Sequence, residues 1–354
     1  MGKKVLMKGN EAIGEAAITA GCRHFFGYPI TPQSELPAYL AKRMPQEGGV
    51  FLQGESEVAS VNMVYGASSA GVRVMTSSSS PGVSLKQEGI SYMVGAELPA
   101  LVCNVQRAGP GLGTIQPAQS DYFQATKGGG HGDYNIIVLS PSSVQEIVDM
   151  VRMAFDLADT YRNPCMLLTD GMLGQLMEPV DFGDYKPMVF EKPWALTGCK
   201  GRPKNTVTSI YIQPERMEEH NLKLQKKFAA IREKEQRWEE LSLSDDTEIL
   251  VVAHGTMARI VKSAMKEAQE QGVKVGVIRP ITVWPFPEKA FRNLRNIQTV
   301  LVVEMSAGQM LEDVKLSING RLPVHFFGRM GGMVPTVEQI LSQIMSLRKS
   351  PAKL

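Results

Sequence analysis

Four short polar segments hold the side chains of this sequence that could do chemistry, and each follows directly on an apolar run. These segments are residues 27–35, 53–57, 76–82 and 106–111. In an open α/β sheet, ligands bind where the carboxyl ends of the strands meet. If the apolar runs are buried parallel strands, we expect the four segments to converge on one cleft.

Thr31 and Glu57 are the candidate groups of the first two segments. Thr31 stands between Pro29 and Pro32, which stiffen the backbone and leave its hydroxyl displayed; alternatively, Thr31 caps a helix whose first residue is Pro32. Glu57 stands where a strand is followed by a helix. A carboxylate there could share a proton with a ring nitrogen of a bound heterocycle. Alternatively, it complements the positive end of the helix dipole.

The third and fourth segments offer hydroxyls and a guanidinium. Residues 77–80 are four consecutive serines ahead of a predicted helix, a pattern typical of an anion-binding or ligand-positioning loop and also of an ordinary polar turn. Arg107 follows the buried run 101–105 after one residue, Gln106, an unusual place for a guanidinium without an anionic partner. Its planar fork suits a carboxylate, either that of a ligand or that of a structural ion pair.

Composition and charge exclude several classes of protein. With 38 Lys and Arg against 36 Asp and Glu in 354 residues, the net charge of +2 argues against a protein that binds nucleic acid by bulk charge. The four cysteines have neither zinc-site nor iron–sulfur spacing, which together with the lack of a disulfide pattern fits a reducing cytoplasm. The first eight residues lack the apolar core of a signal peptide, and no run is long enough to cross a membrane.

Familiar catalytic motifs are also missing. The sequence holds no Walker A, HExxH or GxSxG pattern, and the glycines of residues 109–113 lack the spacing of a dinucleotide fingerprint. A thiamine diphosphate site normally needs a Gly-Asp-Gly segment and a downstream Asn to hold magnesium. The nearest candidate, Thr169-Asp170-Gly171, lacks the helix and the Asn that should follow. We therefore give it no metal-binding role.

The elements that must position these side chains form two α/β alternations. In the first, expected to span residues 1–180, predicted helices follow most of six short apolar strands. The strands are expected at residues 23–27, 50–53, 72–76, 100–106, 136–139 and 164–169. Continuous apolar strands alternating with helices predict a doubly wound, mostly parallel sheet covered on both faces. A second, smaller α/β domain is expected over residues 246–354, with strands at 249–253, 274–278, 300–303 and 324–327.

The segment between them, residues 181–245, has a different character. Its first part is rich in Pro, Gly and Lys and predicts an extended excursion, while residues 214–240 are densely charged and predict a helix. One stripe of that helix is apolar and consists of Leu224, Phe228, Ile231 and Trp238. Such a stripe packs either on its own domain or against a partner chain.

Taken together, the motifs resemble the alpha subunit of 2-oxoacid:ferredoxin oxidoreductases. The resemblance rests on the order of Gly-Tyr-Pro-Ile-Thr-Pro, Glu-Ser-Glu, a Thr-Ser-rich loop ending in Pro-Gly, and Val-Gln-Arg-Ala-Gly-Pro-Gly. It covers nearly the whole chain. Residues 113–117 and 127–133 are most similar to subunits for branched substrates such as 2-oxoisovalerate, with 2-oxoglutarate enzymes next and pyruvate a further alternative.

The resemblance implies a thiamine diphosphate pyrimidine-binding domain followed by a transketolase-C-terminal-like domain. It also implies coenzyme A-dependent oxidative decarboxylation of a 2-oxoacid to acyl-CoA, carbon dioxide and reduced ferredoxin. Glu57 matches the glutamate that bonds the aminopyrimidine ring, and Thr31 and Arg107 match the residues that recognise the substrate. The remaining cofactor contacts implied are Pro29, Ile30, Ser79 and Ser80, although the four serines depart from the Thr-Ser-Gly-Pro-Gly-like loop of the family.

The resemblance also explains what is missing. It assigns magnesium and the diphosphate to a beta subunit, and the [4Fe-4S] clusters to other subunits among beta, gamma and a ferredoxin-like delta. This chain would then complete an active site rather than contain one. Two other functions remain open at this point: a nucleotide- or flavin-binding α/β module, and a scaffold subunit whose site is vestigial.

Overall fold

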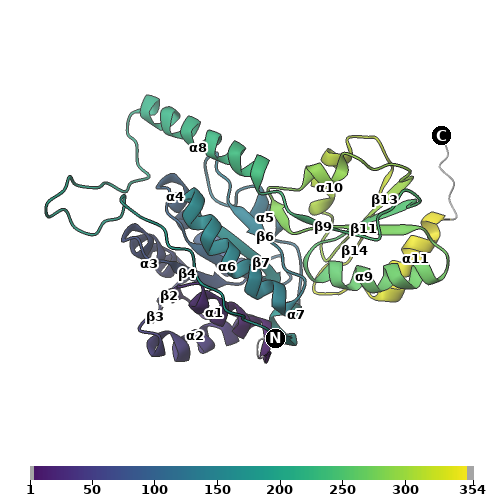
Figure 1. The fold of residues 1–354 in the computed structure, drawn as a ribbon, viewed down its shortest axis with the longest axis horizontal. Coiled ribbons are helices and arrows are strands. Elements are labelled where there is room, and N and C mark those ends of the chain that lie inside the picture. Colours follow the sequence, from purple (N-terminus) through teal and green to yellow (C-terminus); the bar gives the residue numbers. More distant parts are fainter. Residues whose placement is uncertain (1–3, 349–354) are drawn as a thin grey trace.

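The computed structural model describes residues 4–348, which form two α/β domains side by side along the long axis of the molecule (Figure 1). Residues 1–3, part of the stretch in which we expect no signal sequence, lie outside the described residues. Within residues 4–348, no helix combines the length and the apolar composition needed to cross a membrane.

The first sheet has seven strands in the order β12-β6-β7-β5-β4-β2-β3, all parallel except β12. Its strands are β2 (His24–Gly27), β3 (Val50–Gln53), β4 (Val74–Ser78), β5 (Leu101–Gln106), β6 (Ile137–Leu139), β7 (Cys165–Asp170) and β12 (Thr282–Trp284). The chain runs from β2 outward to β3 and then returns to β4 on the other side of β2. The strand order therefore switches direction between β2 and β4, and such a switch opens a crevice at the carboxyl ends.

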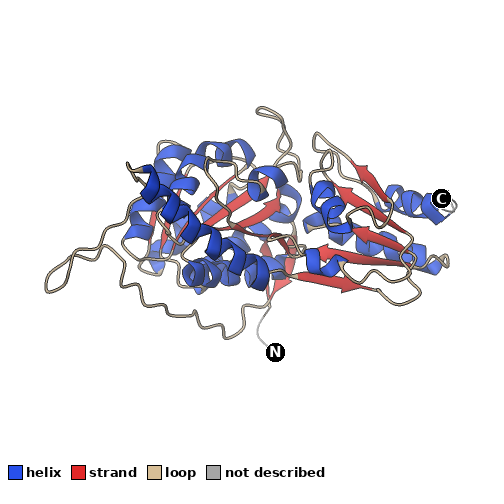
Figure 2. Cartoon of the chain, turned by 90° about the horizontal axis from the view of Figure 1, so that it is seen from above, coloured by secondary structure: helices blue, strands red, loops and turns tan. Residues whose placement is uncertain are grey.

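Helices cover both faces of this sheet (Figure 2). They are α1 (Gly9–Thr19), α2 (Glu35–Gln46), α3 (Glu57–Ser69), α4 (Ser80–Gly95), α5 (Tyr122–Thr126), α6 (Val144–Tyr161) and α7 (Gly171–Gln175). A two-stranded antiparallel pair, β1 (Val5–Lys8) and β8 (Met177–Val180), lies beside them. The expected doubly wound parallel sheet is confirmed, because its central strands are buried on both faces.

The second sheet has five strands in the order β14-β13-β10-β11-β9. They are β9 (Trp238–Leu241), β10 (Ile249–Val252), β11 (Val275–Pro280), β13 (Thr299–Glu304) and β14 (Val324–Gly328), and only β9 is antiparallel. Its helices are α9 (Gly255–Glu270), α10 (Met310–Ile318), α11 (Val337–Arg348) and the short 3₁₀ helix η1 (Glu288–Phe291). Strand β12 crosses back to the first sheet, so the two alternations are not separate in sequence.

Residues 181–213 contain no helix or strand and make the extended excursion that the sequence predicts, with a loop that projects from the molecule (Figure 1). Helix α8 (Pro214–Lys234) follows, and its apolar stripe packs into the first core through Leu224, Phe228 and Ile231. The helix predicted over residues 214–240 is too long, however, and does not include Trp238. The helix ends at Lys234, and Trp238 begins strand β9, because pairing with β11 satisfies the backbone there.

Candidate functional site

The four polar segments follow four neighbouring strands, β3, β2, β4 and β5, at their carboxyl ends. This is the arrangement expected from the sequence, and it brings the segments to one edge of the sheet. One boundary differs from the prediction. Strand β4 runs to Ser78 rather than ending at residue 76, because Ser77 and Ser78 are buried in the middle of the sheet.

Glu57 is the first residue of α3 and is only 6% exposed. The Ser56 hydroxyl accepts from the backbone N–H of Ala59 and caps the helix, so the Glu57 side chain is free for another role. Among residues 4–348, no hydrogen bond reaches the Glu57 carboxylate. Gly82 lies so close that a Cβ atom there would be 2.6 Å from Glu57 Oε1 and 2.1 Å from Ser78 Oγ. Glycine at position 82 therefore makes room for this carboxylate.

Two of the serine hydroxyls are buried and without a partner. Ser78 Oγ and Ser79 Oγ have no hydrogen-bond partner among the described residues, although both side chains are fully buried. A buried hydroxyl without a partner is costly, so such groups often mark a ligand that satisfies them. Ser78 Oγ and Glu57 Oε1 both border the position that a Cβ atom on Gly82 would take, so this hydroxyl and the carboxylate lie close together. We refer to Glu57, Ser78 and Ser79 as the polar cradle.

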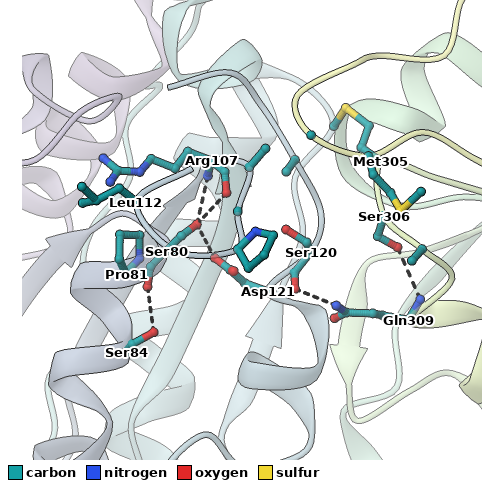
Figure 3. A pocket seen from close by; sticks show the side chains of 18 residues that line it. Ser80, Pro81, Ser84, Arg107, Leu112, Ser120, Asp121, Met305, Ser306 and Gln309 are labelled. Carbon is teal, nitrogen blue, oxygen red and sulfur yellow. Dashed lines mark hydrogen bonds between the residues drawn. The ribbon is translucent and has the colours of Figure 1, made fainter. Parts of the chain in front are cut away.

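The Ser80 hydroxyl is engaged in hydrogen bonds that hold the local structure together (Figure 3). Its Oγ accepts from the backbone N–H of Arg107 at 3.0 Å and donates to Asp121 Oδ2 at 2.6 Å. Burial raises the pKa of Asp121, while the bonds from Ser80 and Asn104 act in the opposite direction. This network ties the start of α4 to the loop that follows β5.

Arg107 lies beside Thr31. Its side chain is 8% exposed, its Nη1 donates to the Thr31 carbonyl at 3.0 Å, and its Nε is buried without a partner. In the part of the chain that the structure describes, no carboxylate forms an ion pair with this guanidinium, so the structural ion pair considered from the sequence is wrong. The expected helix start at Thr31 is also wrong. Helix α2 begins at Glu35, and Thr31 lies in an exposed turn with Pro29 and the half-buried Ile30.

Two cavities adjoin these residues. One, of about 690 Å³, lies between the two domains (Figure 3). The first domain lines it with Ser80, Arg107 and Asp121, and the second domain lines it with Met305, Ser306 and Gln309. The other, of about 590 Å³, contains Thr31, Ile115 and Gly171. Glu57 lines neither of them. Asp170 caps α7, where its Oδ1 accepts from the backbone N–H groups of Met172 and Leu173 at 2.9 and 3.2 Å.

Several residues of this region were missed from the sequence. Gln33 is fully buried and accepts from the Ser77 hydroxyl at 2.5 Å. Lys86 is fully buried within α4, next to the buried Val83, Gln87 and Ile90. The position of Lys86, one turn from Val83 and Ile90 on the same face of α4, could have identified it from the sequence, because lysine is almost never fully buried unless it is paired.

Comparisons with known proteins match the chain over its length. A family model described as pyruvate flavodoxin/ferredoxin oxidoreductase, thiamine diphosphate-binding, matches residues 15–241, and one for pyruvate:ferredoxin oxidoreductase core domain II matches residues 247–340. Ketoisovalerate oxidoreductase subunit VorB of Methanothermobacter marburgensis is 49% identical, with 97% of both chains covered. Subunit KorA of 2-oxoglutarate synthase from the same organism is 36% identical, with 98% of this chain and 100% of KorA covered.

Solved structures agree with the fold. A 2-oxoglutarate:ferredoxin oxidoreductase from Magnetococcus marinus, bound to 2-oxoglutarate, coenzyme A and succinyl-CoA, superposes with a TM-score of 0.87 at 27% identity. The match covers 98% of this chain, which spans 65% of the length of that one. A split-gene transketolase superposes with a TM-score of 0.59 at 14% identity, covering 96% of this chain and 97% of the other, and that likeness concerns the fold alone.

Proposed function

The chain belongs to the pyruvate flavodoxin/ferredoxin oxidoreductase family, and we propose that it is the alpha-type subunit of an enzyme that oxidises 2-oxoisovalerate and related branched 2-oxoacids. The observation that carries the choice of substrate is the 49% identity to a ketoisovalerate oxidoreductase subunit along 97% of both chains, against 36% to a 2-oxoglutarate synthase subunit. In the proposed reaction the bond between the carboxylate and the oxo carbon breaks and carbon dioxide leaves. The sulfur of coenzyme A forms a thioester with the acyl group as its thiol proton leaves to solvent, and the electron pair passes one electron at a time to two equivalents of oxidised ferredoxin.

Thiamine diphosphate supplies the carbanion chemistry of this reaction when it is bound. On this chain, the Glu57 carboxylate would accept a hydrogen bond from a ring nitrogen of the aminopyrimidine and hold the proton shared with it. The buried hydroxyls of Ser78 and Ser79 would satisfy the ring's polar edge. The sequence favoured Ser79 and Ser80 for this contact, but Ser80 Oγ is already engaged by Arg107 and Asp121, so we propose Ser78 in its place.

Arg107 and Thr31 would recognise the substrate. The guanidinium retains free donors and has a buried Nε without a partner, so it can offer two parallel hydrogen bonds to the 2-oxoacid carboxylate. Thr31 lies in an exposed turn, and its backbone carbonyl accepts a hydrogen bond from the same guanidinium. Its hydroxyl would contact the oxo oxygen of the substrate. Pro29 and Ile30 would contact the cofactor ring from the same turn.

The rest of the machinery would lie on partner subunits. We propose that a beta subunit holds the diphosphate and magnesium, and that beta, gamma and ferredoxin-like delta chains hold the [4Fe-4S] clusters. We further propose residues 1–180 as the pyrimidine-binding domain, 181–245 as a linker with α8, and 246–354 as the second domain. The four free cysteines, three of them buried, support a cytoplasmic setting.

The experiment is to purify the native complex under anaerobic conditions and assay a panel of 2-oxoacids with a viologen acceptor. We expect coenzyme A-dependent reduction with the highest kcat/KM for 2-oxoisovalerate. A preference for 2-oxoglutarate or pyruvate would overturn the proposed substrate but not the reaction. If no 2-oxoacid of the panel supported reduction of the acceptor, the proposed function would be overturned, and a scaffold or nucleotide-binding module would be favoured.

A further inference from the structure

Lys86 is a buried amine directly behind the proposed cofactor site, and nothing in the proposed reaction uses it. Its side chain is fully buried. Its Nζ donates to Ser60 Oγ of α3 at 3.0 Å and to Thr76 Oγ1 of β4 at 2.5 Å. No acidic side chain of the described residues lies within ion-pair distance of it. A lysine held this way costs folding free energy, so its presence calls for a functional reason.

The contacts of Lys86 lead to Glu57. The Ser60 hydroxyl, which accepts from Lys86, itself donates to the backbone carbonyl of Glu57 at 2.9 Å. The amine therefore secures the first turn of α3, the turn that presents the Glu57 carboxylate. Gly82, one turn before Lys86 on α4, lies against that same carboxylate, since a Cβ atom there would be 2.6 Å from Glu57 Oε1. Helix α4 thus approaches Glu57 at two successive turns.

The charges of the two groups are also coupled. Burial lowers the pKa of Lys86 to about 7, and the negative charge of Glu57 opposes that decrease. Glu57 is the one charged group among the described residues whose field acts on the amine, from α3; Thr76 on β4 and Ser60 on α3 are neutral.

We propose that Lys86 is a positioning residue for the reaction, which holds the first turn of α3, and with it Glu57, in place through Ser60. This inference rests on the proposed role of Glu57 toward the aminopyrimidine. It explains why α4 carries a lysine on its buried face. It also predicts that Lys86 acts on the pH dependence of cofactor activation and not on the choice of 2-oxoacid.

The main test is Lys86→Met in the assembled complex, with hydrogen–deuterium exchange at the thiazolium C2 measured across pH without 2-oxoacid. Met has a similar length but no charge. We expect exchange to slow about tenfold. The inflection that titration of Lys86 near pH 7 gives the parent profile should be absent from the variant. Ser68→Ala, on the same helix α3 but bonded to Pro99, is the matched control and should keep the parent profile.

A second readout needs no cofactor. In the folded chain Lys86 has a pKa of about 7 against about 10.4 for an unfolded lysine, so between these values the unfolded chain binds more protons. The stability of the parent chain should therefore gain from Lys86 as pH rises from 7 to 10. The melting temperature of the Lys86→Met chain, relative to the parent, should fall over this window. A relative melting temperature independent of pH would mean that the amine is not the buried titrating group inferred here.

Failure of this inference is separable from failure of the proposed function. If Glu57→Gln exchanges at the parent rate, the role of Glu57 is wrong whatever Lys86 does. If Glu57→Gln is slow while Lys86→Met keeps both the parent rate and the parent pH profile, only the inference about Lys86 is overturned. Should the Lys86→Met complex not assemble, Ser60→Ala removes the link but keeps the amine. That variant should exchange several-fold more slowly and retain the inflection near pH 7, and a parent rate would overturn the positioning role.

Discussion

The guanidinium of Arg107 donates a hydrogen bond to the backbone carbonyl of Thr31 at 3.0 Å, across 76 residues of sequence. The two residues come from the loops after β5 and β2, which are separated in the sheet by β4 alone. Because the bond goes to the Thr31 backbone, the Thr31 hydroxyl and the remaining guanidinium donors stay available. Arg107 therefore both shapes the turn and can bind an anion.

Arg107→Ala should lower kcat/KM for every 2-oxoacid. Removing one partner of a desolvated charge pair costs about 2–5 kcal/mol, which corresponds to a loss of roughly 30-fold to several-thousand-fold. Arg107→Lys keeps the charge but loses the fork, and should fall between Ala and the parent. Exchange at the cofactor C2, measured without substrate, should stay near the parent rate. A change of more than tenfold in the preference among oxoacids would contradict a role in binding the shared carboxylate.

Glu57→Gln should leave assembly intact, because the side chains are nearly identical in shape, and should lower turnover by roughly two to four orders of magnitude, as for other acid–base groups. Gln cannot hold the proton shared with the ring. The informative measurement is C2 exchange, which should fall in parallel with turnover. Parent-like exchange would show that another group activates the cofactor.

Much of this site could be predicted because parallel α/β sheets place their strand ends together. Once residues 50–53 and 101–106 are recognised as strands, Glu57 and Arg107 must lie at the same edge of the sheet. The division of work among four adjacent serines could not be predicted in this way. Ser77 bonds to Gln33, Ser80 bonds to Asp121, and only Ser78 and Ser79 are without partners.

Short edge strands were the main omission in the fold. β12 has three residues, lies beside β6 in the first sheet, and belongs by sequence to the second alternation. Its pairing depends on a partner more than 140 residues away, which local propensity does not encode. Trp238 fits both the apolar stripe of α8 and the edge strand β9, and the partner strand β11 decides between them.

Gly82→Ala should separate the geometry of the cradle from its chemistry. The new Cβ would lie 2.1 Å from Ser78 Oγ and 2.6 Å from Glu57 Oε1, so both side-chain ends must move while the backbone can stay. We expect a folded subunit that assembles but has C2 exchange at least tenfold slower, as general acid–base groups are sensitive to position. Gly66→Ala on α3, where a Cβ meets no atom within 4 Å, is the control and should keep the parent rate.

Because His254 is buried, we expect the folded chain to lose stability in mild acid. Complete burial lowers the pKa of this imidazole to about 4, and its Nδ1 lies 2.9 Å from the Ser140 hydroxyl. A folded-state pKa below the unfolded value of about 6.5 gives stability that is present above pH 6.5 and lost as pH falls toward 4. Between pH 6.5 and 5 the loss should approach about 2 kcal/mol. Chemical unfolding of the parent and His254→Phe at several pH values measures it, and equal slopes would contradict the prediction.

Arg279 of β11 should stabilise the contact between the two domains. Its guanidinium is 2% exposed and forms a two-pronged bond to Glu146 of α6, at 2.7 and 2.9 Å, and an ion pair with Glu239 of β9 at 2.8 Å. Burial would raise the pKa of Glu146, but the Arg279 charge and the bonds from Ser142 hold it below its usual value. Glu146 is therefore ionised and dependent on this partner.

Arg279→Met should lower the free energy of unfolding by about 3 kcal/mol, because it leaves two partly buried carboxylates without their cation. Glu146→Gln in the Arg279→Met background should recover part of that loss, since the stranded charge is then gone. The double-mutant cycle, measured by chemical unfolding at pH 7, gives the coupling free energy between the two residues. An additive cycle would mean that Arg279 and Glu146 are not coupled energetically, and would contradict the role of this ion pair in joining the two domains.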